Sequence, residues 1–444
     1  MMFCGFLLKR KSAVRGIALT GALLLLVFNI LEMRGISFLS IDTKGMMEFD
    51  RFALLFNSIA FGCTLILFIL SAKDIEQVGV NYSEYFALIF FILSGVTLVS
   101  SFQSLLILFL GIEIISIPLY ILAGSDKKNL KSNEASLKYF LMGAFSTGLM
   151  LMGIALIYGA KGTFSTGVMN IITEKPSVLM IAGMVLLLFS MAFKVSAAPF
   201  HFWAPDVYDG SPIVFTSFMA TIVKVAAFIA FVRLFDNAFG NLHSYWRLLI
   251  AIITAATLFI GNITAVFQQS VKRMLAYSSI SQAGFMMLAV YSLNSDAKEG
   301  LLLYSAAYSL ATIGIFAVLT RLKDYTFEGF NGFARKQPLL AATTTIFVLS
   351  LAGIPLTAGF LAKFYMLKAT VFTAQGLWLV IFAVLMAAVS VYYYFRLIQA
   401  MYFKEGVTQL IEITPGFKLT LVFVAILIVL LGIFPNLLIY WYYF

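Results

Sequence analysis

Residues 193–228 read FKVSAAPFHFWAPDVYDGSPIVFTSFMATIVKVAAF, and this stretch decides the interpretation of the whole chain. Two apolar segments each contain one lysine, Lys194 and Lys224, on either side of a connection with three prolines, two aspartates and one histidine, His201. A lysine at the centre of a bilayer costs roughly 2.5–3.5 kcal/mol on insertion scales. Two lysines facing one interior are difficult to explain as packing, so we interpret them as carriers of protons.

The composition excludes a soluble domain. Of the 444 residues, 62% are hydrophobic and 11% are charged, whereas soluble domains average about 25% charged residues. The apolar runs are about 20 residues long, which is the length of a membrane-crossing helix rather than of a barrel strand. Because a backbone in lipid must satisfy its own hydrogen bonds, we predict an all-α polytopic membrane protein.

The apolar runs predict thirteen transmembrane helices. Residues 1–8 are apolar but too short to cross, and they are a possible stub of a fourteenth helix. The predicted spans are 14–34, 52–72, 83–100, 102–124, 132–159, 177–198, 211–236, 244–267, 271–293, 299–321, 338–360, 373–402 and 416–442.

Lysine and arginine are unevenly distributed over the connecting loops. When the loops are assigned alternately to two sides, one side carries roughly twice as many of these residues as the other. The richer side is predicted to be cytoplasmic, which places the C-terminus outside and the 193–228 connection on the cytoplasmic side. The formal net charge of +10 is therefore a property of orientation, and we expect no nucleic-acid partner.

Four ionisable residues lie inside apolar runs: Glu113, Lys194, Lys224 and Lys363. Such groups usually face a bundle interior and mark ion or proton paths. Desolvation favours the neutral form of an ionisable group and a nearby opposite charge favours the charged form, so a glutamate–lysine pair can act as a switch. Lysine loses its proton readily when buried, whereas arginine does not. The alternative is a static pair or a lysine that extends to the interface, chiefly for Lys363.

Prolines predict two broken helices. Pro199 follows Lys194, and Pro355 precedes Lys363 within GIPLTAG, residues 353–359. Discontinuous helices in corresponding places of two halves indicate a transport site. We therefore predict one membrane domain, residues 1–403, with two inverted five-helix repeats that contain the broken helices. The predicted parts are N-terminal helices at 1–82, a first half at about 83–236, a second half at about 244–403 and a C-terminal helix in 404–444.

Several polar residues could assist. His201 either relays protons near neutral pH or caps a helix end, and Tyr277 and Gln282 could hold water between the halves. Ser278, Ser279 and Ser281 are expected to serve helix packing. The two cysteines form no metal-binding pattern, and no nucleotide-binding motif is present. We therefore predict neither a metal site nor a cofactor site in this chain.

Five segments together resemble the subunit N family of proton-pumping NADH-quinone oxidoreductase (respiratory complex I), within the wider family of antiporter-like membrane subunits. They cover most of the chain between about residues 50 and 403. The segments are GIEIISIPLYIL at 111–122, NEASLKYFLMGAFSTGLMLMGIALIYG at 133–159, FKVSAAPFHFWAPDVYDGSP at 193–212, QQSVKRMLAYSSISQAGF at 268–285 and SLAGIPLTAGFLAKFY at 350–365.

The resemblance implies a proton-translocating subunit that carries no redox centre. Glu113 would pair with a lysine, Lys194 and Lys224 would relay protons, and Lys363 would end the path on the outer side. Lys138, His201 and Tyr277 also match family positions near the polar axis. Relatives often have histidine where this chain has Gln282, which cannot titrate, so a relay there would need water.

The resemblance also implies fourteen helices, a bacterial inner-membrane location and a complex of several chains. NADH, FMN, iron–sulfur clusters and quinone would bind partner subunits, and the partners would include sibling antiporter-like subunits. A cation/proton antiporter subunit or a membrane-bound hydrogenase-type complex is the alternative function, and an inert scaffold is a third.

Overall fold

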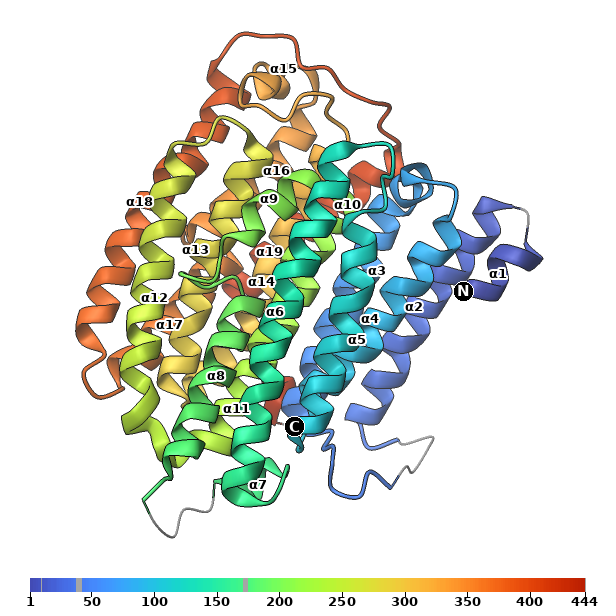
Figure 1. Ribbon diagram of the computed structural model, residues 1–444. Helices are drawn as coiled ribbons and strands as arrows, with labels where there is room; N and C mark the ends of the chain where they lie inside the picture. The colour runs from blue at the N-terminus through green and yellow to red at the C-terminus, as the bar shows by residue number, and fades with distance from the viewer. Residues whose placement is uncertain (9, 37–41, 171–174, 444) are drawn as a thin grey trace.

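Apolar runs of membrane length determine the architecture, because helices satisfy the backbone hydrogen bonds within each run. A computed structural model describes residues 1–8, 10–36, 42–170 and 175–443, and these residues form a bundle of roughly parallel helices (Figure 1). They contain no β-strand, only four isolated β-bridges between loops. Nine of their helical stretches are long and apolar enough to cross a membrane. The predicted all-α membrane class is confirmed.

The N-terminal part and the first predicted half contain the helices up to the middle of the chain. In order they are α1 (Met2–Leu7), α2 (Lys11–Met33), α3 (Arg51–Val78), α4 (Tyr82–Ser101), α5 (Leu105–Ala123), α6 (Leu130–Lys161), α7 (Thr166–Met169), α8 (Val178–Lys194), α9 (Trp203–Gly210), α10 (Ile213–Phe218), the π-helical segment η1 (Met219–Val223), α11 (Lys224–Phe239) and the 3₁₀ segment η2 (Gly240–Leu242).

The second predicted half and the C-terminal part follow. Their helices are α12 (His243–Val266), α13 (Val271–Ser292), α14 (Ser295–Leu319), the 3₁₀ segment η3 (Glu328–Phe330), α15 (Phe333–Lys336), α16 (Pro338–Ala352), α17 (Ala358–Val371), α18 (Leu377–Phe403), α19 (Pro415–Ile433) and α20 (Asn436–Tyr443).

Three predicted spans differ from the observed helices. The prediction of one helix at 338–360 is wrong, because α16 ends at Ala352 and a separate helix, α17, begins at Ala358. The span 177–198 ends early, at Lys194. The span 416–442 divides into α19 and α20. Proline explains each interruption, since it removes a backbone donor and blocks the preceding turn.

The break between α16 and α17 depends on two glycines. Gly353 has φ +82°, a left-handed conformation that glycine adopts without strain. A Cβ at Gly353 would lie 2.9 Å from Cδ of Lys363. A Cβ at Gly359 would lie 1.9 Å from the Ser350 carbonyl oxygen, so α17 can approach α16 closely only because this residue is glycine. The predicted broken helix around Pro355 is therefore present.

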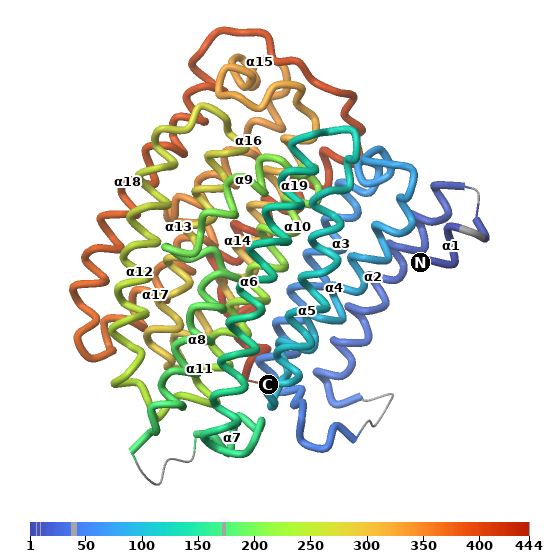
Figure 2. Tube along the Cα trace, in the orientation of Figure 1, coloured from blue at the N-terminus to red at the C-terminus, as the bar shows by residue number. Residues whose placement is uncertain are grey.

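The loops lie at two ends of the bundle. We call the end that carries residues 125–129, 320–337 and 404–414 the upper face, and the end that carries η2 and the chain end near α20 the lower face (Figure 2). This alternation agrees with the predicted assignment of loops to two sides. Lys9 and part of the 160–176 loop, which entered that prediction, lie outside the described residues.

The helices differ in how deeply they are buried. The apolar stretch of α14 that could cross a membrane is completely buried within the protein. The corresponding stretches of α2 and α19 are 22% and 28% buried. α14 therefore lies at the centre of the bundle. The peripheral helices present apolar side chains outward, which suits contact with lipid or with other membrane chains.

Candidate functional site

Lys194 is the last residue of α8 and lies at the first helix break. Its ammonium group donates a hydrogen bond to Oγ of Ser116 on α5 at 2.9 Å. Glu113 lies one turn before Ser116 and accepts a hydrogen bond from Oγ1 of Thr147 at 2.8 Å. Glu113 acts electrostatically on Lys194, but no ion pair joins the two among the described residues. The glutamate and the lysine are neighbours with separate hydroxyl partners.

Lys224 is buried, with 1% of its surface exposed, at the junction of the π-helical segment and α11. Its ammonium group donates to Oγ of Ser279 on α13 at 2.9 Å and to the Ser279 carbonyl at 3.1 Å. The ammonium also lies 5.6 Å from the ring centroid of Tyr208, a cation–π distance. π-Helical turns are frequent at functional sites, because they change the direction of the residues that follow.

Lys363 takes its partners from the second broken helix. Its ammonium group donates to the carbonyls of Leu351 and Ala352, at 2.9 and 3.1 Å, where α16 ends. It also lies 4.6 Å from the ring centroid of Phe285. A helix end leaves carbonyls without intrahelical partners and favours a cation there. Lys363 is only 6% exposed, so its side chain is directed into the protein and does not extend to an interface.

A polar network surrounds Lys363. Gln282 donates to the Leu351 carbonyl at 2.9 Å and to the Tyr394 hydroxyl at 3.0 Å, and it accepts from the Tyr304 hydroxyl. The Tyr394 hydroxyl also shares a hydrogen bond with Ser278. Gln282, Tyr304 and Lys363 border a small cavity with room for about one water molecule. Hydroxyl groups both donate and accept, which suits proton transfer along the network.

Tyrosines connect the lysine sites. Tyr208, whose ring lies under the Lys224 ammonium, is adjacent to Ser196, two residues beyond Lys194. On α14, Tyr308 is adjacent to Ser279 and lies one turn from Tyr304, with 6.5 Å between the ring centroids. Buried tyrosines, serines and one glutamine therefore extend from Lys194 past Lys224 to Lys363. We call this set the buried axis.

Lys138 lies away from the buried axis, at the upper face. Its ammonium group forms ion pairs with Glu134 at 2.7 Å and with Asp206 at 2.8 Å, and Arg273 pairs with Asp206 at 3.2 Å. Burial raises the pKa of the Asp206 carboxyl, but the hydrogen bonds and charges of Lys138 and Arg273 outweigh burial and hold this pKa below its usual value. Asp206 is thus held as an anion in a charged cluster.

The remaining predicted residues have different positions. His201 is buried within the first helix break, with its ring 4.5 Å from that of Phe202. Gln282 lies at the centre of the Lys363 network. Tyr277 is partly buried on α13 and packs against the apolar core. No group of three or more histidine, cysteine, aspartate or glutamate residues that could hold a metal ion occurs in the described chain.

Several partners of the lysines were not predicted from the sequence. Ser279 was expected to serve packing, yet its hydroxyl is the partner of Lys224, and Ser278 contacts Tyr394. Ser116 was not singled out, although it lies one turn from Glu113 on the same helix, which is a usable signal. Tyr304 and Tyr394 are separated by many residues along the chain, so nothing in the sequence pairs them.

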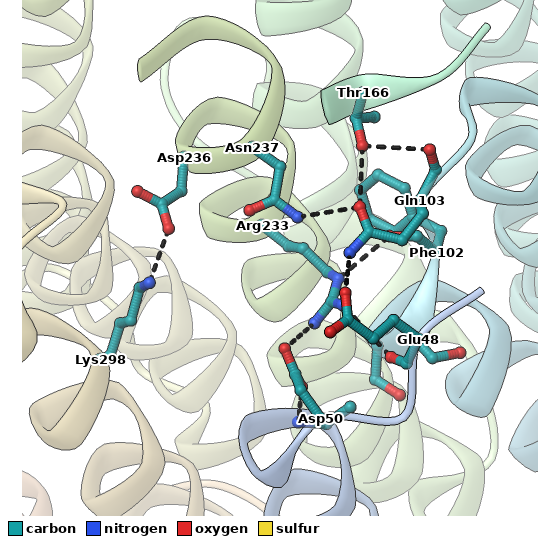
Figure 3. Close-up of polar contacts among 12 residues, drawn as sticks. Glu48, Asp50, Phe102, Gln103, Thr166, Arg233, Asp236, Asn237 and Lys298 are labelled. Atoms are coloured by element: carbon teal, nitrogen blue, oxygen red, sulfur yellow. Dashed lines mark hydrogen bonds and ion pairs between the residues drawn. The ribbon is translucent and has the colours of Figure 1, made fainter. Parts of the chain in front are cut away.

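The lower face carries a second charged cluster, drawn in Figure 3. Arg233 on α11 is 4% exposed and pairs with Asp50 at 2.8 Å, while its other donors reach the carbonyls of Phe102 and Glu48. Nearby, Lys298 pairs with Asp236 at 2.6 Å. These cations have carboxylate partners, in contrast to the lysines of the buried axis.

Comparison with known proteins gives a consistent family. A family model described as "NADH:quinone oxidoreductase/Mrp antiporter, TM" matches residues 103–390. A curated protein from Cytophaga hutchinsonii, "NADH-quinone oxidoreductase subunit N", is 44% identical over 401 residues, which are 89% of this chain and 87% of the relative.

Two solved structures match over nearly the full length. A chain in respiratory complex I from Thermus thermophilus with bound aureothin is 33% identical, with a TM-score of 0.85, and the match covers 98% of this chain and 95% of that chain. A chain in the Mrp complex from Dietzia sp. DQ12-45-1b has a TM-score of 0.87 at 17% identity, covering 99% and 93% of the two chains. The second match shows a shared fold alone.

Proposed function

The chain belongs to the NADH:quinone oxidoreductase/Mrp antiporter family, as an antiporter-like membrane subunit of the subunit N type, and from this membership we propose that its buried axis moves protons across the membrane while the complex reduces quinone. The identities of its relatives favour this assignment over a cation/proton antiporter, for which the Mrp likeness gives only the fold. NADH, FMN, iron–sulfur clusters and quinone would bind partner subunits in the bacterial inner membrane.

One observation supports the proposal above all: the buried lysines are partnered by neutral oxygens. Lys194 contacts a serine hydroxyl, Lys224 a serine hydroxyl and carbonyl, and Lys363 two helix-end carbonyls. A carboxylate in direct contact would stabilise the ammonium form strongly, whereas neutral oxygens hold it less. These lysines can therefore bind and release protons as the surrounding charge changes.

The proposed direction follows the orientation predicted from the loops. Protons enter from the cytoplasmic side, taken as the upper face, to Lys194 or Lys224, pass along the hydroxyl-bearing residues, and leave through Lys363. Glu113 adjusts the charge state of Lys194 without touching it, in response to movement in a neighbouring membrane subunit. The C-terminus then lies outside, at the lower face.

The test is a Lys224→Ala variant of the intact complex in sealed membrane vesicles. Proton pumping is followed by quenching of a pH-sensitive dye, and NADH oxidation by an artificial acceptor reports the assembly of the redox subunits. We expect pumping to fall about tenfold or more, because removal of a proton-transfer group commonly costs about 10²–10⁴ in rate. Unchanged pumping in an assembled complex would overturn the proposal.

A further inference from the structure

Two cavities open at the upper face, and both reach the end of α9. The first is bordered by α6 and α9, has a volume of about 190 Å³, and contains Lys138, Asp206 and Arg273. The second has a volume of about 380 Å³ and lies between the ends of α3, α10, α13 and α14. A water occupies about 30 Å³ in the liquid, so the second cavity has room for several.

The first cavity is separated from the buried axis by aromatic rings. Tyr139 stacks on Trp203 with 4.6 Å between ring centroids, and Phe193 lies 5.6 Å from the same indole. The indole nitrogen donates to the Phe193 carbonyl, which holds this group together. The charges in the cavity already neutralise one another as ion pairs. It is a poor entrance for protons to Lys194.

The second cavity contains a buried lysine that the proposed relay does not use. Lys272, the second residue of α13, is 6% exposed, and its ammonium group donates to the carbonyls of Asp209 and Ser211 at 2.6 and 2.8 Å. Like the lysines of the buried axis, it has only neutral oxygen partners. The charged groups around it are Asp209 on α9, Lys131 on α6, Asp126 in the preceding loop and Asp74 on α3, which is paired with Arg321.

Polar groups lead from Lys272 toward Lys224. Lys272 precedes Ser279, the Lys224 partner, by seven residues, so the two share one face of α13 about 10 Å apart along its axis. The hydroxyls of Ser211, which lines the second cavity, and of Ser217 on α10 are buried and have no hydrogen-bond partner among the described residues. Buried hydroxyls are normally satisfied by protein or by water, so water is the natural partner here.

We propose that the second cavity is the proton entrance and that Lys272 is the first buried proton carrier, delivering protons to Lys224. Its ammonium group releases one proton inward along Ser211 and Ser217, and the resulting amine then takes up a proton that enters from the upper face and is carried to it by cavity water. This inference rests on the proposed function and adds to it an entrance and a residue.

A structural role for Lys272 makes a different prediction. In a purely structural role, Lys272 would only hold the carbonyls at the end of α9. An arginine would preserve that contact because it keeps the charge and the donors. As a carrier, it must lose its proton, which an arginine does not do. Lys272→Arg therefore separates the two roles, and Lys131→Arg, at the rim of the same cavity, is the matched control.

The experiment measures dye quenching in sealed vesicles that contain the whole complex. We expect Lys272→Arg to lower proton pumping about tenfold or more, with artificial-acceptor activity intact and Lys131→Arg pumping like the unmodified complex. Normal pumping by Lys272→Arg would overturn the inference. If Lys224→Ala abolishes pumping in parallel, only the entrance is wrong; if Lys224→Ala also pumps normally, the proposed function itself fails.

A second variant covers the case in which Lys272→Arg does not assemble. Ser211→Ala/Ser217→Ala removes two hydroxyls that have no hydrogen-bond partner among the described residues, so none of the described hydrogen bonds is lost. Ser305→Ala, whose hydroxyl bonds its own helix, is the control. Pumping should fall severalfold in the double variant alone, and equal pumping in both would contradict the route.

Discussion

The cations of the buried axis and three cations at the faces differ in their partners. At the faces, Arg233, Lys298 and Lys368 each lie within 3 Å of a carboxylate. Inside, Lys224 and Lys363 contact serine or carbonyl oxygens. A carboxylate partner fixes a cation and so joins segments of the fold, whereas a neutral partner leaves the proton free to move. Under the proposed function, the same residue type would serve structure at the faces and proton transfer inside.

The largest expected difference in proton pumping is between variants of two lysines on α17. Lys363 belongs to the buried axis, and Lys368, five residues later, pairs with Asp296 at 2.9 Å. We expect Lys363→Ala to lower proton pumping about tenfold or more, because it removes a proton carrier, and Lys368→Ala to leave pumping nearly unchanged. If both variants lose pumping equally in vesicles with the same amount of complex, a lysine of the buried axis is no more important for pumping than one paired with a carboxylate.

The next effect concerns stability and the lower cluster. Arg233→Met removes a buried guanidinium and leaves Asp50, which is 39% exposed, without its partner. Water can reach that carboxylate, so we expect a cost of roughly 1–3 kcal/mol, below that of a fully buried pair. A lower melting temperature of the purified complex, with normal pumping per assembled complex, is the predicted result.

Asp50→Asn sharpens that test. Asp50 also caps α3 by accepting from the Ala53 amide, and asparagine caps a helix about as well as aspartate. This variant keeps the cap but leaves the buried Arg233 guanidinium without its carboxylate, so its melting temperature should fall at least as far as that of Arg233→Met. An unchanged melting temperature in both variants would show that the lower cluster contributes nothing to stability.

A smaller effect is expected where a lysine keeps part of its contact. Ser279→Ala removes the hydroxyl partner of Lys224 but retains the Ser279 carbonyl. Loss of one hydrogen bond is worth about 0.5–1 kcal/mol, which corresponds to roughly two- to fivefold in rate. Pumping should fall by that amount, and Ser305→Ala should not change it. A complete loss would indicate that the hydroxyl itself is an obligatory relay.

The smallest effect is a pH dependence at the upper face. The pKa of Asp206 is held below its usual value mainly by Lys138 and Arg273 against the opposing effect of burial. A carboxyl with a lowered folded-state pKa stabilises the protein above its usual pKa, and this contribution disappears as the pH falls through the lowered value. Lys138→Met should therefore melt slightly earlier than the unmodified protein at neutral pH, and the difference should vanish in acid. A difference independent of pH would contradict this assignment.

The sequence was sufficient for features that local chemistry determines. Apolar length predicted the helices, and Pro355 with its glycines predicted the second break. Lys224 and Lys363 were found because a charge in an apolar run is costly. Each of these patterns lies within about one helix of sequence, so it could be recognised without knowledge of the fold.

The partners of these residues could not be predicted. Arg233 lies near the end of the predicted span 211–236, yet it pairs with a residue far away in sequence. Lys272 lies at the start of the predicted span 271–293, yet it is buried against the end of α9. Ser279 was assigned to packing because serine usually has that role between membrane helices. In every case the function depends on which helices meet, and one helix alone does not contain that information.

The most direct test of proton transfer by the buried lysines exchanges lysine and arginine at two positions on one helix. Lys224 and Arg233 both lie on α11, the first with neutral partners and the second with a carboxylate. Proton pumping per assembled complex is measured for Lys224→Arg and Arg233→Lys in the same sealed vesicles. We predict that Lys224→Arg stops pumping, since arginine keeps its proton, and that Arg233→Lys pumps normally. Normal pumping by Lys224→Arg would contradict the account.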